Sequence, residues 1–256
     1  MLMGEFKLST ELNEYIVDGL MEGYREYLEI RREKARKMKV SGAYAWVKGN
    51  HIDDQVARAC KPYGVESKLA KAGLTWQYLQ FQHQDEKILF IVKNSRYFHE
   101  EQVDRGRDAN GKIRNGKMSY MENLMKINSE IDFSNIKTDN TNDSVQLQLF
   151  EDNLLSEEDN VEIAKIESNY DRFYIITYEI DESQLISGIS LFMPNPIDNK
   201  AYLIDDLTTY INPESIQIDD ELKEVLSNDV DSNNNYDAYR FDIGINEETK
   251  EIDRKS

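Results

Sequence analysis

Two short stretches rich in aromatic and β-branched residues constrain the fold of this chain more than any other feature. Residues 75–83 (TWQYLQFQH) and 87–93 (KILFIVK) are joined by the polar turn 84–86, which is the pattern of a β-hairpin. The second stretch is apolar at consecutive positions, so both of its faces need cover. The sequence therefore predicts a hairpin whose second strand lies inside a sheet and is covered on both sides.

Helical patterns flank this hairpin in the first half of the chain. Apolar residues recur at four-residue steps over 10–39, which predicts a helix with Thr10 as its N-cap. Asn50 is the expected N-cap of a second helix that stops near residue 62, and Asp53 fits a variant of the capping box. Shorter helices are expected at residues 66–72 and 118–127.

The second half of the chain has the pattern of strands. Turn signals separate the expected strands, and the links between them are too short for helical crossovers, which favours antiparallel pairing. These strands are residues 173–180, 185–192, 201–204, 207–211 and 236–245, with a short helix around 222–226. We expect an α+β protein with a mildly basic, helix-rich domain over 1–133, an acidic linker over 134–160, and an acidic β-rich domain over 161–256 that ends in a charged tail.

Charge divides the chain into two unequal halves. The formal net charge is −18, made up of +4 over residues 1–127 and −22 over residues 128–256. Such an asymmetry indicates either separate partners for the two halves or halves that meet each other. A protein partner at the acidic half is one expectation, and an acidic DNA mimic with an inhibitor or antitoxin role is an alternative.

The compartment is suggested by what the sequence lacks. Cys60 is the only cysteine, which excludes an internal disulfide and suggests a reducing environment. The N-terminal residues do not have the basic and apolar regions of a secretory signal, and no apolar stretch is long enough to cross a bilayer. We expect a cytoplasmic protein without membrane contact and, since no glycine spacing fits a nucleotide-binding motif, without a cofactor.

Basic residues gather in two places that predict contact with nucleic acid. The loop 100–117 and the end of the first helix both concentrate cations that could reach phosphates. A flexible insertion and a solvated helix end are the alternative interpretations. The candidate nucleic-acid-binding residues are Arg105, Arg107, Lys112, Arg114 and Lys117 in the loop, and Arg31, Arg32, Arg36 and Lys37 in the helix.

The expected helices at 50–61 and 66–72 also follow the order of a helix-turn-helix. A hairpin comes after them, as in a winged DNA-binding domain. Plain packing of two helices against each other explains the same pattern, because helix pairs are common in proteins that do not bind DNA.

Catalytic chemistry has little support in the sequence. A metal site or general base could be assembled from His51, Asp54 and His99, but no spacing is diagnostic, and we assign no catalytic or metal-binding residue. A metal-dependent nuclease that pairs an aspartate with a downstream E-x-K is an alternative, because the hairpin offers Lys93. The glutamate of that pattern is replaced by Ile91, so we expect a protein without enzymatic activity.

A short apolar segment stands alone in the acidic linker. Gln146-Leu147-Gln148-Leu149-Phe150 resembles the pentapeptide through which many bacterial replication and repair proteins bind the DNA sliding clamp. The resemblance implies that Leu149 and Phe150 are apolar anchors, that Leu147 is a lesser contact, and that Gln146 fixes the register; Gln148 departs from the pattern. Docking of these side chains onto the protein's own surface is the alternative interpretation.

Two further segments resemble an uncharacterised family of Gram-positive bacteria and their mobile elements. They are residues 45–50 (AWVKGN) and 173–180 (FYIITYEI), and the resemblance implies no activity. Together with the clamp-binding pattern and the basic residues, it suggests a DNA-metabolism or defence-linked adaptor, for example in phage defence or toxin–antitoxin control. This adaptor would recruit the sliding clamp and contact nucleic acid weakly through its basic half.

Overall fold

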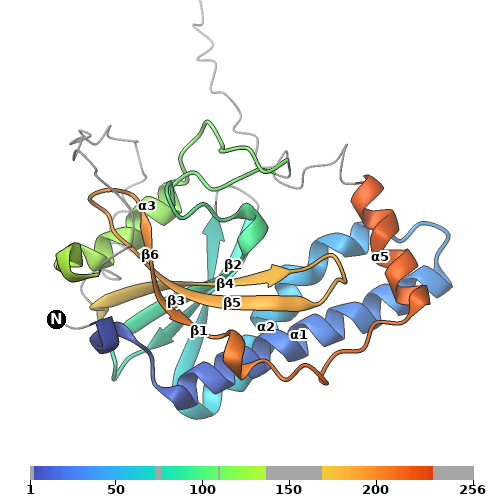
Figure 1. Ribbon diagram of the computed structural model, residues 1–256, viewed down its shortest axis with the longest axis horizontal. Helices are drawn as coiled ribbons and strands as arrows, with labels where there is room; N and C mark the ends of the chain where they lie inside the picture. Colours follow the sequence, from blue (N-terminus) through green and yellow to red (C-terminus); the bar gives the residue numbers. More distant parts are fainter. Residues whose placement is uncertain (1–2, 73–75, 109, 137–168, 233–256) are drawn as a thin grey trace, which may run out of the picture.

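The computed structural model describes residues 3–72, 76–108, 110–136 and 169–232, and its centre is one six-stranded sheet (Figure 1). The strands lie side by side in chain order, from β1 at one edge to β6 at the other. Neighbours are antiparallel except β3 and β4, which are parallel. The strands are β1 (Val65–Ala72), β2 (Trp76–His83), β3 (Ile88–Asn94), β4 (Arg172–Ile180), β5 (Ile186–Pro194) and β6 (Ala201–Asp206).

Helices cover both faces of this sheet, which gives the expected α+β class. The α-helices are α1 (Thr10–Lys37), α2 (Lys48–Cys60), α3 (Ser119–Met125) and α5 (Asp220–Ser232). Short 3-10 helices connect the larger elements: η1 (Met3–Phe6), η2 (Gly42–Val47), η3 (Lys61–Tyr63), η4 (Ser95–Tyr97), η5 (Lys126–Asn128), η6 (Phe133–Asn135) and η7 (Thr208–Tyr210). None of the helices within the described ranges has both the length and the apolar character needed to cross a membrane.

Strand β3 contributes side chains to a hydrophobic core on each face of the sheet. Its side chains alternate between the faces, and Ile88 and Phe90 join the core with α1 and α2, whereas Leu89 and Ile91 join the core with α3. All four are buried. The prediction that the second hairpin strand is central and covered on both sides is confirmed.

Helices α1 and α2 form a close pair on one face of the sheet (Figure 1). Gly19 and Gly23 of α1 face the backbone of α2, and a Cβ added to either would come within 2.6 Å of an α2 Cα atom. The N-cap of α1 is Ser9, one residue before the expected Thr10, because the Ser9 hydroxyl accepts the Leu12 N–H. Helix α2 starts at Lys48, so Asn50 lies inside the helix instead of capping it.

Several local predictions were wrong. Residues 66–72 belong to strand β1 instead of a helix, because all eight residues of β1 pair with β2; the helix-turn-helix interpretation fails for the same reason. Residues 207–211 contain the 3-10 helix η7 instead of a strand. The helices expected at 118–127 and 222–226 are confirmed as α3 and α5, and the strand expected at 236–245 lies outside the described residues.

The sheet and several ion pairs join the two halves of the chain. The parallel pair β3–β4 combines strands from either side of the predicted linker 134–160. Cations of the first half meet acids of the second in Lys7–Asp205, Arg32–Asp219, Arg36–Glu221 and Lys87–Asp171, and Lys200 of the second half meets Glu101 of the first. Charge asymmetry therefore reflects, in part, halves that contact each other.

Candidate functional site

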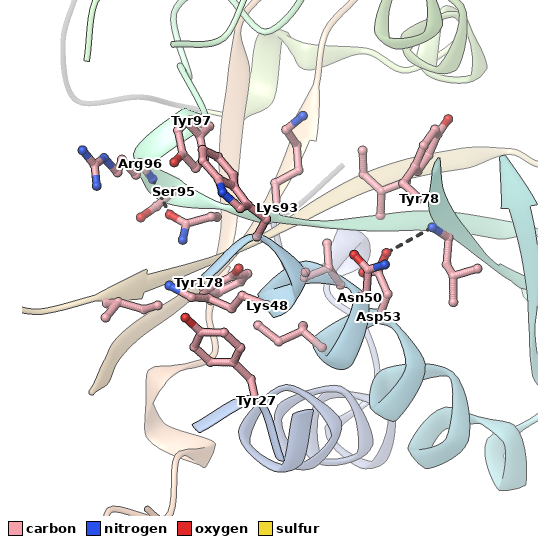
Figure 2. A pocket seen from close by; sticks show the side chains of 18 of the residues that line it. Tyr27, Lys48, Asn50, Asp53, Tyr78, Lys93, Ser95, Arg96, Tyr97 and Tyr178 are labelled. Atoms are coloured by element: carbon pink, nitrogen blue, oxygen red, sulfur yellow. Dashed lines mark hydrogen bonds between the residues drawn. The ribbon is translucent and has the colours of Figure 1, made fainter. Parts of the chain in front are cut away.

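Strands β2 and β3 separate after a short paired stretch, and a cleft lies between them. These two strands pair at three positions only, Phe81↔Phe90 to His83↔Ile88, near the hairpin turn. Beyond these positions, within the described strands, β2 pairs only with β1 and β3 pairs only with β4. We call this opening the fork. Residues 77–79 of β2 and 91–94 of β3 line a cleft of about 660 Å³ there, together with the first residues of α2 (Figure 2).

Asp53 of α2 takes the place of a strand partner in the fork. Continuing the β2–β3 register would put Val92 opposite Leu79. The N–H of Leu79 instead donates to Oδ2 of Asp53 at 3.2 Å, as the dashed line in Figure 2 shows. Burial of this carboxyl raises its pKa to about 7, and the Leu79 hydrogen bond partly opposes that rise. The carboxyl therefore caps the free edge of β2.

Asn50 lies one helical turn before Asp53, and both side chains reach from α2 toward the strands (Figure 2). Residues three apart on a helix share a face. Asn50 is exposed, whereas Asp53 is half-buried. An amide and a carboxyl thus stand next to each other on one wall of the cleft, opposite the edge of β3.

Several aromatic rings also line the cleft. The half-buried rings are Trp46, Tyr78, Tyr97 and Tyr120, and the buried ones are Tyr27 and Tyr178. Tyr78 and Tyr120 contact each other with centroids 5.2 Å apart, and burial raises the pKa of Tyr78. Tyr78 and Tyr97 lie on opposite sides of the fork (Figure 2).

The cations of the cleft do not converge on one point. Lys48 lies 5.3 Å from the ring centre of Tyr27, and Nζ of Lys93 donates to the Tyr120 hydroxyl at 2.9 Å. Arg96 lies on the opposite side of Tyr97 from the fork and extends away from it (Figure 2). Four acids, Asp53, Asp54, Glu179 and Asp181, line the same cleft. This mixed charge does not favour a site built around a phosphate.

The predicted basic surface at the end of α1 is occupied by the protein itself. Arg31 is buried and donates to the carbonyl oxygen of Ser41 at 2.7 Å. Arg32 and Arg36 pair with Asp219 and Glu221, next to and within the first turn of α5. Lys37 pairs with Glu33 in its own helix.

The predicted basic loop is held together by its own side chains. Arg107 donates to the Phe98 carbonyl at 3.3 Å, and Arg114 donates to the Arg107 carbonyl at 3.1 Å. Lys117 pairs with Glu122 at 3.0 Å. Arg105 is half-buried and Lys112 is exposed. Three of the five loop cations thus have structural contacts.

The histidines lie apart and have local contacts. Nδ1 of His51 is 3.4 Å from Glu26, and Nδ1 of His99 accepts the N–H of Glu101. His83 is buried and accepts the N–H of Glu86. Across the described ranges, no group of three or more His, Cys, Asp or Glu residues is placed to hold a metal ion. Ile91, at the position of the nuclease glutamate, is buried in the core with α3.

Little in the sequence pointed to this site. The sequence pattern offers Lys93 for chemistry and favours helix-capping roles for Asn50 and Asp53. Their i, i+3 spacing beside the apolar stripe of Ile52 and Val56 was the available signal, and it acquires meaning only when β2 and β3 are known to separate. The clamp-binding candidates Gln146, Leu147, Leu149 and Phe150 lie outside the described residues.

Comparisons with protein-family models, curated proteins and solved structures gave no match. The resemblances of residues 45–50, 146–150 and 173–180 therefore stay predictions from the sequence.

Proposed function

We propose that this protein is a non-catalytic adaptor in DNA metabolism or defence on a mobile element, which recruits the sliding clamp through residues 146–150. The observation that carries the proposal is the pentapeptide QLQLF in an acidic, polar segment. Apolar anchors in such a segment favour binding to a pocket on a partner. Ile136 and Tyr170, close to the two ends of residues 137–168, are both buried.

Nucleic-acid contact by this adaptor is better supported at the fork than at the predicted basic residues. Arg31, Arg32, Arg36 and Lys37 have partners within the protein. The fork combines aromatic rings with hydrogen-bonding groups, which are the elements that recognise unpaired bases. The DNA-mimic alternative loses support, because Asp205, Asp219 and Glu221 are paired with cations of the first half.

The clamp proposal is tested with the full chain and a purified bacterial sliding clamp by isothermal titration calorimetry. Changing Leu149 and Phe150 together to alanine removes both expected anchors, so we expect binding to weaken by a factor of 100 or more, on the order of 3 kcal/mol. The matched control changes Leu154 and Leu155 to alanine, an apolar pair in the same segment, and should bind like the unchanged chain. No binding by the unchanged chain, or equal loss in both variants, contradicts the proposal.

A further inference from the structure

We infer that the fork between β2 and β3 binds a nucleobase that carries an exocyclic amino group, in a nucleoside or in single-stranded nucleic acid. This inference deepens the proposed function, because it gives the adaptor's nucleic-acid contact a place and a chemistry. The inference also goes beyond the proposed function, since the fork could bind a free nucleoside whether or not the chain binds a clamp.

The first element is the free edge of β3. In an antiparallel ladder, every second residue directs both its N–H and its C=O toward the same neighbouring strand. In the register set by Phe81↔Phe90, Val92 is the next residue of β3 to face β2 in this way. Within the described parts of both strands, Val92 has no ladder partner in β2. One donor and one acceptor of the main chain therefore face the cleft, where they can pair with the edge of a planar base.

The second element is the polar wall on α2. Asn50 offers an amide with both donor and acceptor atoms, and Asp53 offers a carboxyl beside it (Figure 2). An asparagine amide can bind the N6 and N7 edge of adenine with two hydrogen bonds, and a carboxyl accepts from an exocyclic amino group. Uracil and thymine have no such amino group. This wall therefore favours adenine over uracil.

The third element is the set of rings at the sides of the fork. Trp46, Tyr78 and Tyr97 are half-buried and line the cleft. Unpaired bases gain affinity by stacking on such rings. The volume of about 660 Å³ is in the usual range for a small ligand and does not admit a duplex. The fork thus suits one base and its sugar.

Charge argues against a site driven by phosphates. Lys48 and Lys93 each lie against a different tyrosine ring, and four acids share the cleft. Phosphate-driven binding weakens steeply as salt increases, whereas hydrogen bonding and stacking do not. We therefore expect the affinity for a nucleoside to change less than about twofold between 50 and 200 mM salt.

The experiment is calorimetric titration of the full chain with adenosine, uridine, adenosine monophosphate and a short oligo(dA). We expect saturable binding of adenosine and at least about tenfold weaker binding of uridine. Equal affinities for adenosine and its monophosphate indicate a free-nucleoside site, and tighter binding of oligo(dA) indicates a strand as the natural source; both support the inference.

Matched variants locate the binding. Asn50→Ala removes the amide from an exposed position and should weaken adenosine binding at least about tenfold, whereas Lys112→Ala, at an exposed position of the loop outside the cleft, should leave it unchanged. The inference is overturned if neither nucleoside binds, or if Asn50→Ala binds adenosine as well as the unchanged chain. It is also overturned if the fork instead binds an extended peptide, selected from a library, that Asn50→Ala no longer binds. Clamp binding by Asn50→Ala, measured in parallel, stays normal in every case, so failure here is distinct from failure of the clamp proposal.

Discussion

The two sides of helix α2 contrast with each other. On one side, α2 packs against α1 along a closed seam, where Gly19 and Gly23 bring the two backbones together opposite Val56 and Ile52. On the other side, Asp53 faces the fork, where two neighbouring strands separate around a cleft. One short helix thus forms a close backbone contact on one side and part of the wall of an open cleft on the other.

The two sides of α2 differ in the side chain that lies between its backbone and the neighbouring backbone. Glycine places nothing there, so α1 and α2 meet directly, and the apolar residues around the seam exclude water. Asp53 places a carboxyl at the edge of β2, where it receives the N–H that a strand would otherwise receive. Because the seam fixes the position of α2, it also fixes the distance from Asp53 to Leu79. The contact between α1 and α2 therefore also holds Asp53 in position at the fork.

Filling the seam should have the largest effect. A Cβ at position 23 would lie 2.5 Å from the Cα of Ile52 and 2.7 Å from the carbonyl oxygen of His51. Both are backbone atoms that cannot move without shifting α2. We expect Gly23→Ala to lower the free energy of unfolding by about 4 kcal/mol or more, measured by urea denaturation.

The matched control for the seam is Gly49→Ala, on the facing helix. No atom lies within 4 Å of a Cβ added there, and alanine favours a helix over glycine by up to ~1 kcal/mol. This variant should be as stable as the unchanged chain or slightly more stable. If both alanine variants lose the same free energy of unfolding, the close approach of α1 and α2 does not explain the loss in Gly23→Ala.

Removing the ionisable group from the fork should have the next largest effect, and it should depend on pH. The pKa of Asp53 is about 7 in the folded protein and about 4 in an unfolded chain. Between these values the folded state holds the proton that the unfolded state releases. The free energy of unfolding therefore falls as the pH rises from about 4 to about 7, by up to about 4 kcal/mol.

Asp53→Asn retains an oxygen for the Leu79 N–H but cannot ionise. The variant should match the unchanged chain near pH 4 and exceed its stability at pH 8, measured by urea denaturation across that range. Asp54→Asn, at the exposed neighbouring position with a partner in Arg58, is the control and should show no such gain at pH 8. A stability difference between Asp53→Asn and the unchanged chain that is constant from pH 4 to pH 8 would contradict a neutral buried carboxyl.

The seam and the fork differ in how far the sequence could predict them. Local periodicity predicts α1, and consecutive apolar residues predict a buried β3, because each pattern depends on the residue's own element. Residues 66–72 were wrongly predicted as a helix, since Glu66, Lys68 and Ala70 favour helices and only pairing with β2 overrides that preference. The fork depends on where two strands stop pairing, which no local pattern records. Asp53 therefore looked like a helix cap, although its partner is Leu79 on another element.

The smallest effect is expected at the far end of the seam, where α1 leaves the core and meets α5 through surface charges. The side chains of Arg36 and Glu221 are about half exposed, and their pairing raises the pKa of the arginine and lowers that of the glutamate. Exposed pairs contribute little to stability, and salt screens them. We expect Arg36→Gln to leave global unfolding almost unchanged and to speed amide hydrogen exchange in the first turn of α5 at low salt only. Lys37→Gln, which removes a pair within α1, should leave exchange in α5 unchanged. If Arg36→Gln destabilises the whole protein as Gly23→Ala does, the end of α1 belongs to the closed seam, and the contrast between backbone contact and surface charge does not hold.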